Sequence, residues 1–167
     1  MHSFDRGVIY TAIGEDYIRE AQLSARSVRT SLPDTCIVLF TDSPLEDKNA
    51  FDDVIRLENL NRRPQLDKLA CIKNSPFANT LFLDTDTYLC GSPSELFDLA
   101  GKFDIAMALD RHYYDFFPED TAVPGAFCEF NQGSWCSGTR RRCRRWFRPR
   151  WIGRRISTAE TGIPIGD

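Results

Sequence analysis

The stretch Thr80–Gly91, TLFLDTDTYLCG, joins a short apolar run to two closely spaced carboxylates. The run at 81–83 is typical of a strand buried in a parallel sheet, and it stops abruptly at Asp84. If the extended backbone continues, Asp84 and Asp86 point to the same side, because side chains of a strand repeat every two residues. Two converging carboxylates suit Mg²⁺ or Mn²⁺. The alternative is a simple turn, in which aspartates accept hydrogen bonds from nearby backbone amides.

Strands and helices are expected to alternate on both sides of this stretch. Continuous apolar runs predict strands, and apolar residues at helical spacing predict helices. The expected strands cover residues 7–12, 36–41, 54–57, 80–84 and 105–109, and the expected helices cover 17–31, 66–72 and 92–99. At the start of the last helix, Ser92, Pro93 and Glu95 fit a capping box. The alternation predicts an α/β fold with a mainly parallel sheet and flanking helices.

Polar residues stand where the expected strands end. They are Thr11, Asp42, Asp84, Asp86 and Asp110. Ligands of open α/β sheets bind outside the carboxyl ends of the strands, so these positions predict a site at that edge of the sheet. The chain has no Gly-x-Gly-x-x-Gly, P-loop or Gly-x-Ser-x-Gly motif, which disfavours a dinucleotide fold, a P-loop nucleotidase and a serine hydrolase.

Composition indicates one soluble domain with an uneven charge. The 167 residues are 42% hydrophobic and 27% charged, and the net charge of −3 divides into about −10 for residues 1–133 and +7 for the remainder. The six cysteines form no Cys-x-x-Cys pair, so reduced thiols are expected and a zinc site is not. No secretory signal and no apolar run long enough to span a bilayer occurs, which favours the cytoplasm.

Five segments together resemble a known family. YTAIGEDY, CIVLFTD, LDKLACIKNSPFANTLFLDTDTYL, IAMALD and CEFNQG follow one another in the order found in nucleotide-diphospho-sugar glycosyltransferases of the GT-A fold. The chain is most similar to the glycogenin-like and lipopolysaccharide-galactosyltransferase-like group (GT8-like), over residues 7–133. The resemblance implies a Rossmann-like GT-A sheet and transfer of a sugar from a nucleotide-diphosphate donor to an acceptor.

The resemblance also implies how the donor and a metal ion bind. Asp84 and Asp86 form the Asp-x-Asp motif, which would hold Mn²⁺ or Mg²⁺ against the diphosphate, with Asp84 also contacting the donor. Thr11 and Ala12 would line the base and ribose pocket through backbone groups, and Tyr17 would stack on the base. The metal would neutralise the leaving nucleoside diphosphate.

Three further residues are implied in catalysis. Lys68 would face the phosphates or the sugar, although Lys73 on the same helix is a rival for that role. Asp110 and Asn131 would approach the donor sugar and the acceptor. The resemblance favours retention of configuration over inversion.

After Gly133 the resemblance stops, so we expect a donor-binding half at 1–133 and an unstructured Arg/Trp-rich tail at 134–167. The tail has nine arginines and no histidine, so the late histidine that completes the family's metal shell has no candidate, and the acceptor-binding part is missing. The tail fits a nucleic-acid arm, a segment for anionic lipid, or a reading-frame change. We favour the last and expect a truncated or frameshifted transferase of doubtful activity.

Two other functions compete with sugar transfer. A haloacid-dehalogenase-like phosphatase also places Asp-x-Asp after a buried strand, but Tyr88 stands where its motif needs Thr or Val, and three strands precede the motif here. A non-catalytic nucleotide-sugar or nucleic-acid binding module is the other alternative. The expected partners are a nucleotide-diphosphate sugar and an unknown glycan, lipid or protein acceptor, with nucleic acid disfavoured.

Overall fold

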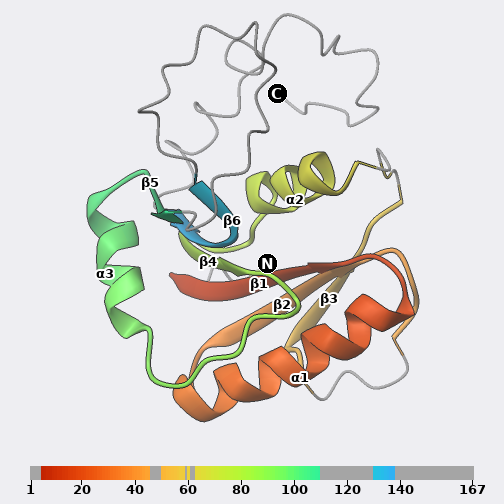
Figure 1. The fold of residues 1–167 in the computed structure, drawn as a ribbon, viewed down its shortest axis with the longest axis horizontal. Coiled ribbons are helices and arrows are strands. Elements are labelled where there is room, and N and C mark those ends of the chain that lie inside the picture. Colours follow the sequence, from red (N-terminus) through yellow and green to blue (C-terminus); the bar gives the residue numbers. More distant parts are fainter. Residues whose placement is uncertain (1–4, 46–49, 59, 61–62, 110–129, 138–167) are drawn as a thin grey trace, which may run out of the picture.

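The computed structural model describes residues 5–45, 50–58, 60, 63–109 and 130–137, which form one mixed sheet and three helices (Figure 1). In chain order the elements are β1 (Arg6–Ala12), α1 (Glu15–Ser31), β2 (Cys36–Thr41), β3 (Asp53–Arg56), α2 (Pro64–Lys73), β4 (Asn79–Leu83), α3 (Ser94–Lys102), β5 (Ile105–Leu109) and β6 (Phe130–Ser137). The strand order is β3-β2-β1-β4-β6-β5. Strands β1 to β4 run parallel, and β6 runs antiparallel to both β4 and β5.

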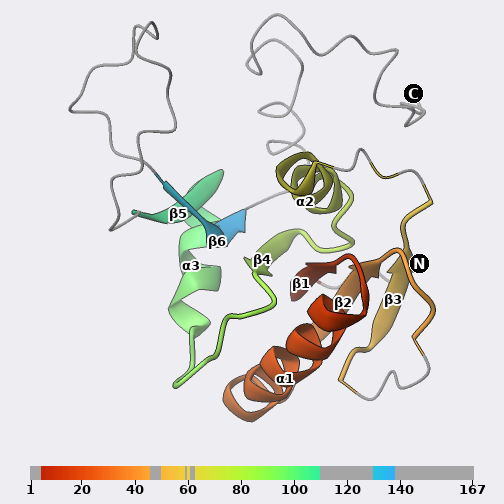
Figure 2. The ribbon, with the colours of Figure 1, turned by 45° about the vertical axis from the view of Figure 1, so that its right-hand side comes forward.

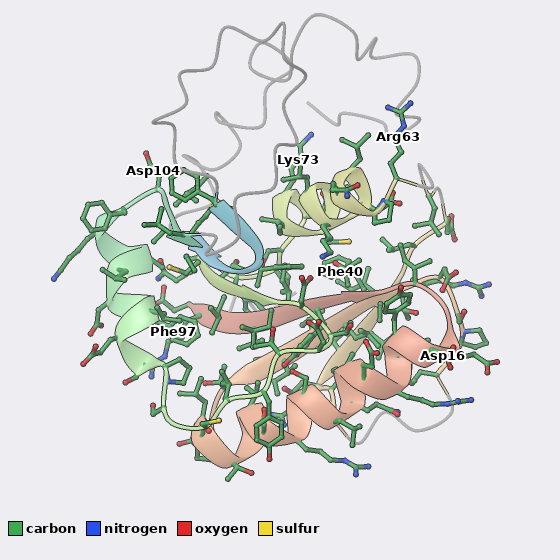
Figure 3. The ribbon with its side chains drawn as sticks, viewed as in Figure 1. Asp16, Phe40, Arg63, Lys73, Phe97 and Asp104 are labelled. Atoms are coloured by element: carbon green, nitrogen blue, oxygen red, sulfur yellow. The ribbon has the colours of Figure 1, made fainter. Side chains whose placement is uncertain are left out.

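The sheet separates two apolar clusters. Alternation along β1 sends Val8 and Tyr10 to the face covered by α1 and α3, and Ile9 to the face covered by α2. Figure 1 shows α1 and α2 on opposite faces of the sheet, and Figure 2 shows the same layers after a turn. In Figure 3, Phe97 points from α3 toward the sheet and Phe40 points from β2 toward α2. The predicted mainly parallel α/β sheet with flanking helices is therefore confirmed.

Helix α1 begins where the sequence has glycine followed by two acids. Gly14 adopts φ 92° and ψ 156°, a conformation open almost only to glycine, and Glu15 and Asp16 occupy the first helical turn. Acidic side chains there interact favourably with the helix dipole. The buried side of the helix carries small residues, among them Ala21 and Ala25, which let the helix approach the sheet closely.

Two details of the sequence analysis are corrected by the structure. The capping box at Ser92 does not form: α3 begins at Ser94, its cap is Pro93, and no side chain bonds the cap. The end of regular structure that we expected at Gly133 lies inside β6, which continues to Ser137. Residues 138–167, with all nine arginines of the tail, lie outside the described residues, so their expected lack of structure stays a prediction.

Candidate functional site

A pocket of about 590 Å³ opens at the carboxyl ends of β1 and β4, between the start of α1 and α2. Its walls contain most of the residues that the sequence singled out. The lining residues are Thr11, Ile13, Tyr17, Glu20, Leu60, Pro64, Asp67, Lys68, Asp84, Thr85 and Asp86. The described walls therefore carry four carboxyl side chains and one lysine.

The two aspartates of the motif lie in a turn and not on an extended strand. Strand β4 ends at Leu83, and the Thr87 amide donates to the Asp84 carbonyl oxygen over 3.1 Å. The extended backbone does not continue beyond Leu83, so the condition under which we expected Asp84 and Asp86 to point to the same side is not met. Both aspartates nevertheless line the same pocket.

The two aspartates differ in their surroundings. Asp84 is largely buried, and its Oδ1 atom lies 2.5 Å from Nζ of Lys68, which reaches across from α2. Asp86 is exposed and has no hydrogen-bond or ion-pair partner within the described part of the chain. Asp84 is therefore held in place by the protein, whereas the Asp86 carboxylate is available to a ligand.

Lys68 and its rival Lys73 lie on different sides of α2. Lys68 lines the pocket, and its ammonium also lies 5.9 Å from the centroid of the Phe82 ring. Lys73 is exposed and points away from the sheet (Figure 3). Of the two lysines, only Lys68 has the position that the predicted role requires.

Of the three residues expected to contact the nucleoside, two line the pocket and one lies in the core. Thr11 lines the pocket and is 9% exposed, yet its hydroxyl has no hydrogen-bond partner in the described structure. Burial raises the pKa of the nearby Cys71 thiol and the Thr11 hydroxyl partly offsets this, although the two groups do not reach hydrogen-bonding geometry. Tyr17 lines the pocket and is 57% exposed. Ala12 is absent from the lining, and its side chain is buried under α1.

Asp42 follows the end of β2, and its carboxylate accepts a hydrogen bond from the backbone instead of lining the pocket. Its Oδ1 atom accepts hydrogen bonds from the Gly14 amide at 3.0 Å and from the Ser43 hydroxyl at 2.9 Å. The first bond ties the end of β2 to the β1–α1 connection, whose residues Thr11 and Ile13 line the pocket. Asp42 therefore shapes the pocket from outside its walls.

The two remaining candidates cannot be placed in the pocket. Asp110 lies outside the described residues. Asn131 belongs to β6, and because its neighbour Phe130 pairs with Leu109, this end of β6 lies where β5 ends. The backbone of Asn131 therefore runs near the carboxyl edge of the sheet, and its side chain lies outside the described part.

Sequence reasoning missed three polar lining residues. Asp67 is only 3% exposed, and its position directly before Lys68 was the signal that could have found it. Glu20 stands three residues after Tyr17 and so shares its side of α1. Thr85 lies between the two motif aspartates and donates to Oε2 of Glu20 over 2.8 Å.

Neither a preformed metal-binding cluster nor a membrane-spanning helix occurs in the described ranges of the chain. Among these residues, no group of three or more His, Cys, Asp or Glu side chains is arranged to hold a metal ion. None of the helices described is both long and apolar enough to cross a membrane.

The fold of the chain is similar to that of solved glycosyltransferase structures. No family model and no curated protein sequence matches the chain. The apo form of the glycosyltransferase GlyE from Streptococcus pneumoniae TIGR4 superposes with a TM-score of 0.61 at 18% identity, covering 86% of this chain and 36% of GlyE. The galactosyltransferase LgtC, solved with donor and acceptor sugar analogs, gives 0.61 at 16% identity, covering 83% of this chain and 59% of LgtC.

These matches define the class of fold. The chain has the GT-A fold of nucleotide-sugar glycosyltransferases, as the resemblance implied. Its likeness extends to GlyE and LgtC over most of its own length, but it spans only 36% of the one and 59% of the other.

Proposed function

We propose that the pocket binds a nucleotide-diphosphate sugar and that the chain provides the donor-binding half of a metal-dependent glycosyltransferase, which passes the sugar to an acceptor still to be identified. One observation carries the proposal. A single pocket at the carboxyl edge of a GT-A sheet collects Thr11, Tyr17, Lys68, Asp84 and Asp86. These residues come from four separate segments of the chain, and each was singled out for donor or metal binding.

The charge of the pocket supports a cation as part of the ligand. Four carboxyl groups and one ammonium line the described walls, so a diphosphate entering alone meets net repulsion. The donor set also fits a hard divalent ion, since Asp84 keeps its second oxygen and Asp86 presents a carboxylate to solvent. When bound, Mn²⁺ or Mg²⁺ would stabilise the negative charge on the departing diphosphate.

The protein residues bind and orient the donor. The Lys68 ammonium holds Asp84 and faces the pocket, where it also attracts phosphate oxygens. The unpaired hydroxyl of Thr11 is buried at the pocket wall, and a ligand hydroxyl or amide would remove the cost of leaving it without a partner. The exposed ring of Tyr17 offers a flat surface for a base.

Titration calorimetry with UDP, with and without Mn²⁺, tests the proposal. The wild-type protein should bind UDP only with the metal, and Asp86→Asn should weaken that binding by at least tenfold, because one of two metal ligands loses its charge. Asp98→Asn is the matched control, since Asp98 is an exposed aspartate of α3 outside the pocket.

The outcomes separate the functions. If neither UDP nor any other nucleoside diphosphate binds with Mn²⁺ or Mg²⁺, the proposal is wrong. If a nucleotide sugar binds but is neither hydrolysed nor transferred, the non-catalytic binding module replaces the transferase. Equal binding by Asp86→Asn and Asp98→Asn would mean that Asp86 is not a ligand of the metal.

A further inference from the structure

The turn that carries Asp84 and Asp86 continues into the segment 87–89, and residues 85–89 are hydrogen-bonded to one side of α1. Three side chains of the helix, spaced as i, i+4 and i+7, each bond an alternate residue of that segment. The pairs are Glu20 with the Thr85 hydroxyl, Ser24 with the Thr87 carbonyl oxygen, and Ser27 with the Leu89 amide. Figures 1 and 2 both show the chain after β4 running beside α1.

The spacing of the contacts follows from the helical repeat. Positions i, i+4 and i+7 lie on one side of a helix, so Glu20, Ser24 and Ser27 face the same segment and contact Thr85, Thr87 and Leu89 in turn. A shift of the segment by one residue would put side chains where backbone groups now bond. We call this set of three contacts the α1 ladder, and its geometry fixes the register of the segment against the helix.

The ladder explains why a buried helix face contains serines. Ser24 and Ser27 are 2% and 3% exposed, where apolar residues would otherwise be expected. Ser27 donates to the Ser24 carbonyl oxygen over 2.6 Å and accepts from Leu89 over 3.0 Å. Ser24 donates its one proton to Thr87, so the Tyr10 hydroxyl, 2.8 Å away, must be the donor to Ser24.

The first contact of the ladder reaches the motif itself. Thr85 stands between the two aspartates and is 9% exposed, whereas Asp86 is exposed and has no partner of its own among the described residues. Thr85, directly before Asp86, is held from α1, where Oε2 of Glu20 accepts a hydrogen bond from the Thr85 hydroxyl over 2.8 Å.

We propose that Glu20 is a positioning residue of the metal–diphosphate site, which holds the Asp84–Asp86 turn in its binding conformation by accepting the Thr85 hydrogen bond. The role depends on the acceptor oxygen and not on the charge of Glu20. It rests on the proposed function, because it concerns the same site. Glu20 is exposed, so its replacement leaves the core untouched.

Three variants on one helix test the role. Glu20→Ala removes the acceptor, Glu20→Gln keeps an oxygen that accepts the same bond, and Glu15→Ala removes an exposed glutamate whose described partner is Arg19. We expect Glu20→Ala to weaken Mn²⁺-dependent UDP binding by about 3- to 10-fold, the size of one lost hydrogen bond. Glu20→Gln and Glu15→Ala should stay within about twofold of the wild type, a margin smaller than one hydrogen bond.

Hydrogen–deuterium exchange without ligand supplies the second readout. Exchange at 85–89 should rise in Glu20→Ala alone, with β1 and β2 as protected as in the wild type. A wild type that binds no nucleotide with metal contradicts the proposed function and the positioning role together. A binding wild type with equal affinity in Glu20→Ala contradicts the positioning role alone. Equal loss in Glu20→Gln and Glu20→Ala assigns the effect to charge and also overturns it.

Discussion

The ammonium of Lys68 lies 2.5 Å from the Asp84 carboxylate and joins α2 to the turn that follows β4. Both side chains are about three-quarters buried, at 27% and 25% exposure. Without a metal, Lys68 therefore supplies the positive charge that Asp84 needs. If Asp84 binds a divalent cation as proposed, the same ammonium would have to give up part of that contact.

Replacement of Lys68 should therefore separate metal binding from nucleotide binding. In Lys68→Met we expect Mn²⁺ alone to bind several-fold more tightly, because a competing charge is gone, with about fivefold corresponding to 1 kcal/mol. UDP with Mn²⁺ should bind more weakly, because the phosphate contact proposed for Lys68 would be lost. Calorimetric titrations with Mn²⁺ alone and with UDP plus Mn²⁺ measure the two effects.

The control for Lys68 is available on the same helix. Lys73→Met removes an exposed lysine that points away from the sheet, so both affinities should remain at wild-type values. Weaker Mn²⁺ binding by Lys68→Met would show that the ion pair supports the metal site and does not compete with it.

Gly7 and Phe77 provide a test of the packing near the start of β1. A Cβ atom at Gly7 would lie 2.3 Å from Cζ of the buried Phe77 ring, so one of the two residues has to move. Gly7→Ala should lower the free energy of unfolding by about 1–3 kcal/mol, the usual cost of overpacking. Urea denaturation of the variant against the wild type measures the loss.

The second half of this test replaces the Phe77 ring with a smaller side chain. Phe77→Leu alone should destabilise the fold through lost contacts, but combined with Gly7→Ala it should cost less than the two changes added together. Additive costs would mean that the destabilisation at Gly7 comes from the backbone and not from the ring.

The sequence predicted best those elements whose signal is local. The continuous apolar runs gave β2 (Cys36–Thr41) and β5 (Ile105–Leu109) with their observed bounds. Helix α1 begins at Glu15, two residues before the first predicted residue. The two acidic residues that we placed before the helix form part of its first turn. A short continuous apolar run is itself a signal for a buried strand, so these strands could be predicted without knowing which strands pair with them.

What the sequence could not predict depends on distant partners. Strand β6 has no apolar alternation and forms because it fills the gap between β4 and β5, and its pairing with both is non-local. Glu20 looked like an ordinary solvent-facing residue of α1, and only the path of the loop after β4 brings Thr85 to it. The grouping of Thr11 with the two aspartates followed from the rule that ligands bind at the carboxyl ends of parallel strands, whereas Lys68 was implied by the family resemblance.

The Tyr10–Ser24 pair allows a double-mutant test of the core hydrogen bond that adjoins the α1 ladder at Ser24. Ser24→Ala leaves the fully buried Tyr10 hydroxyl without its partner, and we expect a loss of about 1–3 kcal/mol in the free energy of unfolding. Adding Tyr10→Phe removes the orphaned hydroxyl, so the double variant should be more stable than Ser24→Ala alone. Chemical denaturation of the four proteins measures the coupling, and a double variant less stable than Ser24→Ala would contradict it.

Alkaline pH should destabilise the fold through groups that are buried in their protonated form. Burial raises the pKa of the Cys71 thiol from 9.0 to about 12 and that of Tyr10 from 10.0 to about 12. Above pH 9 the unfolded chain releases the Cys71 proton while the folded chain keeps it, so the stability is complete below pH 9 and falls as the pH rises toward 12. For Cys71 the slope approaches about 1.4 kcal/mol per pH unit.

Urea denaturation at pH 8 and pH 10.5, in the presence of a reducing agent, measures this dependence. Cys71→Ala should be less stable than the wild type at pH 8, because it leaves a small cavity beside Thr11, yet it should lose less stability between the two pH values. Cys90→Ala, which removes an exposed thiol, should keep the wild-type difference. An unchanged pH dependence in Cys71→Ala would mean that the Cys71 thiol does not carry the alkaline loss, and Tyr10→Phe would then be compared in the same way.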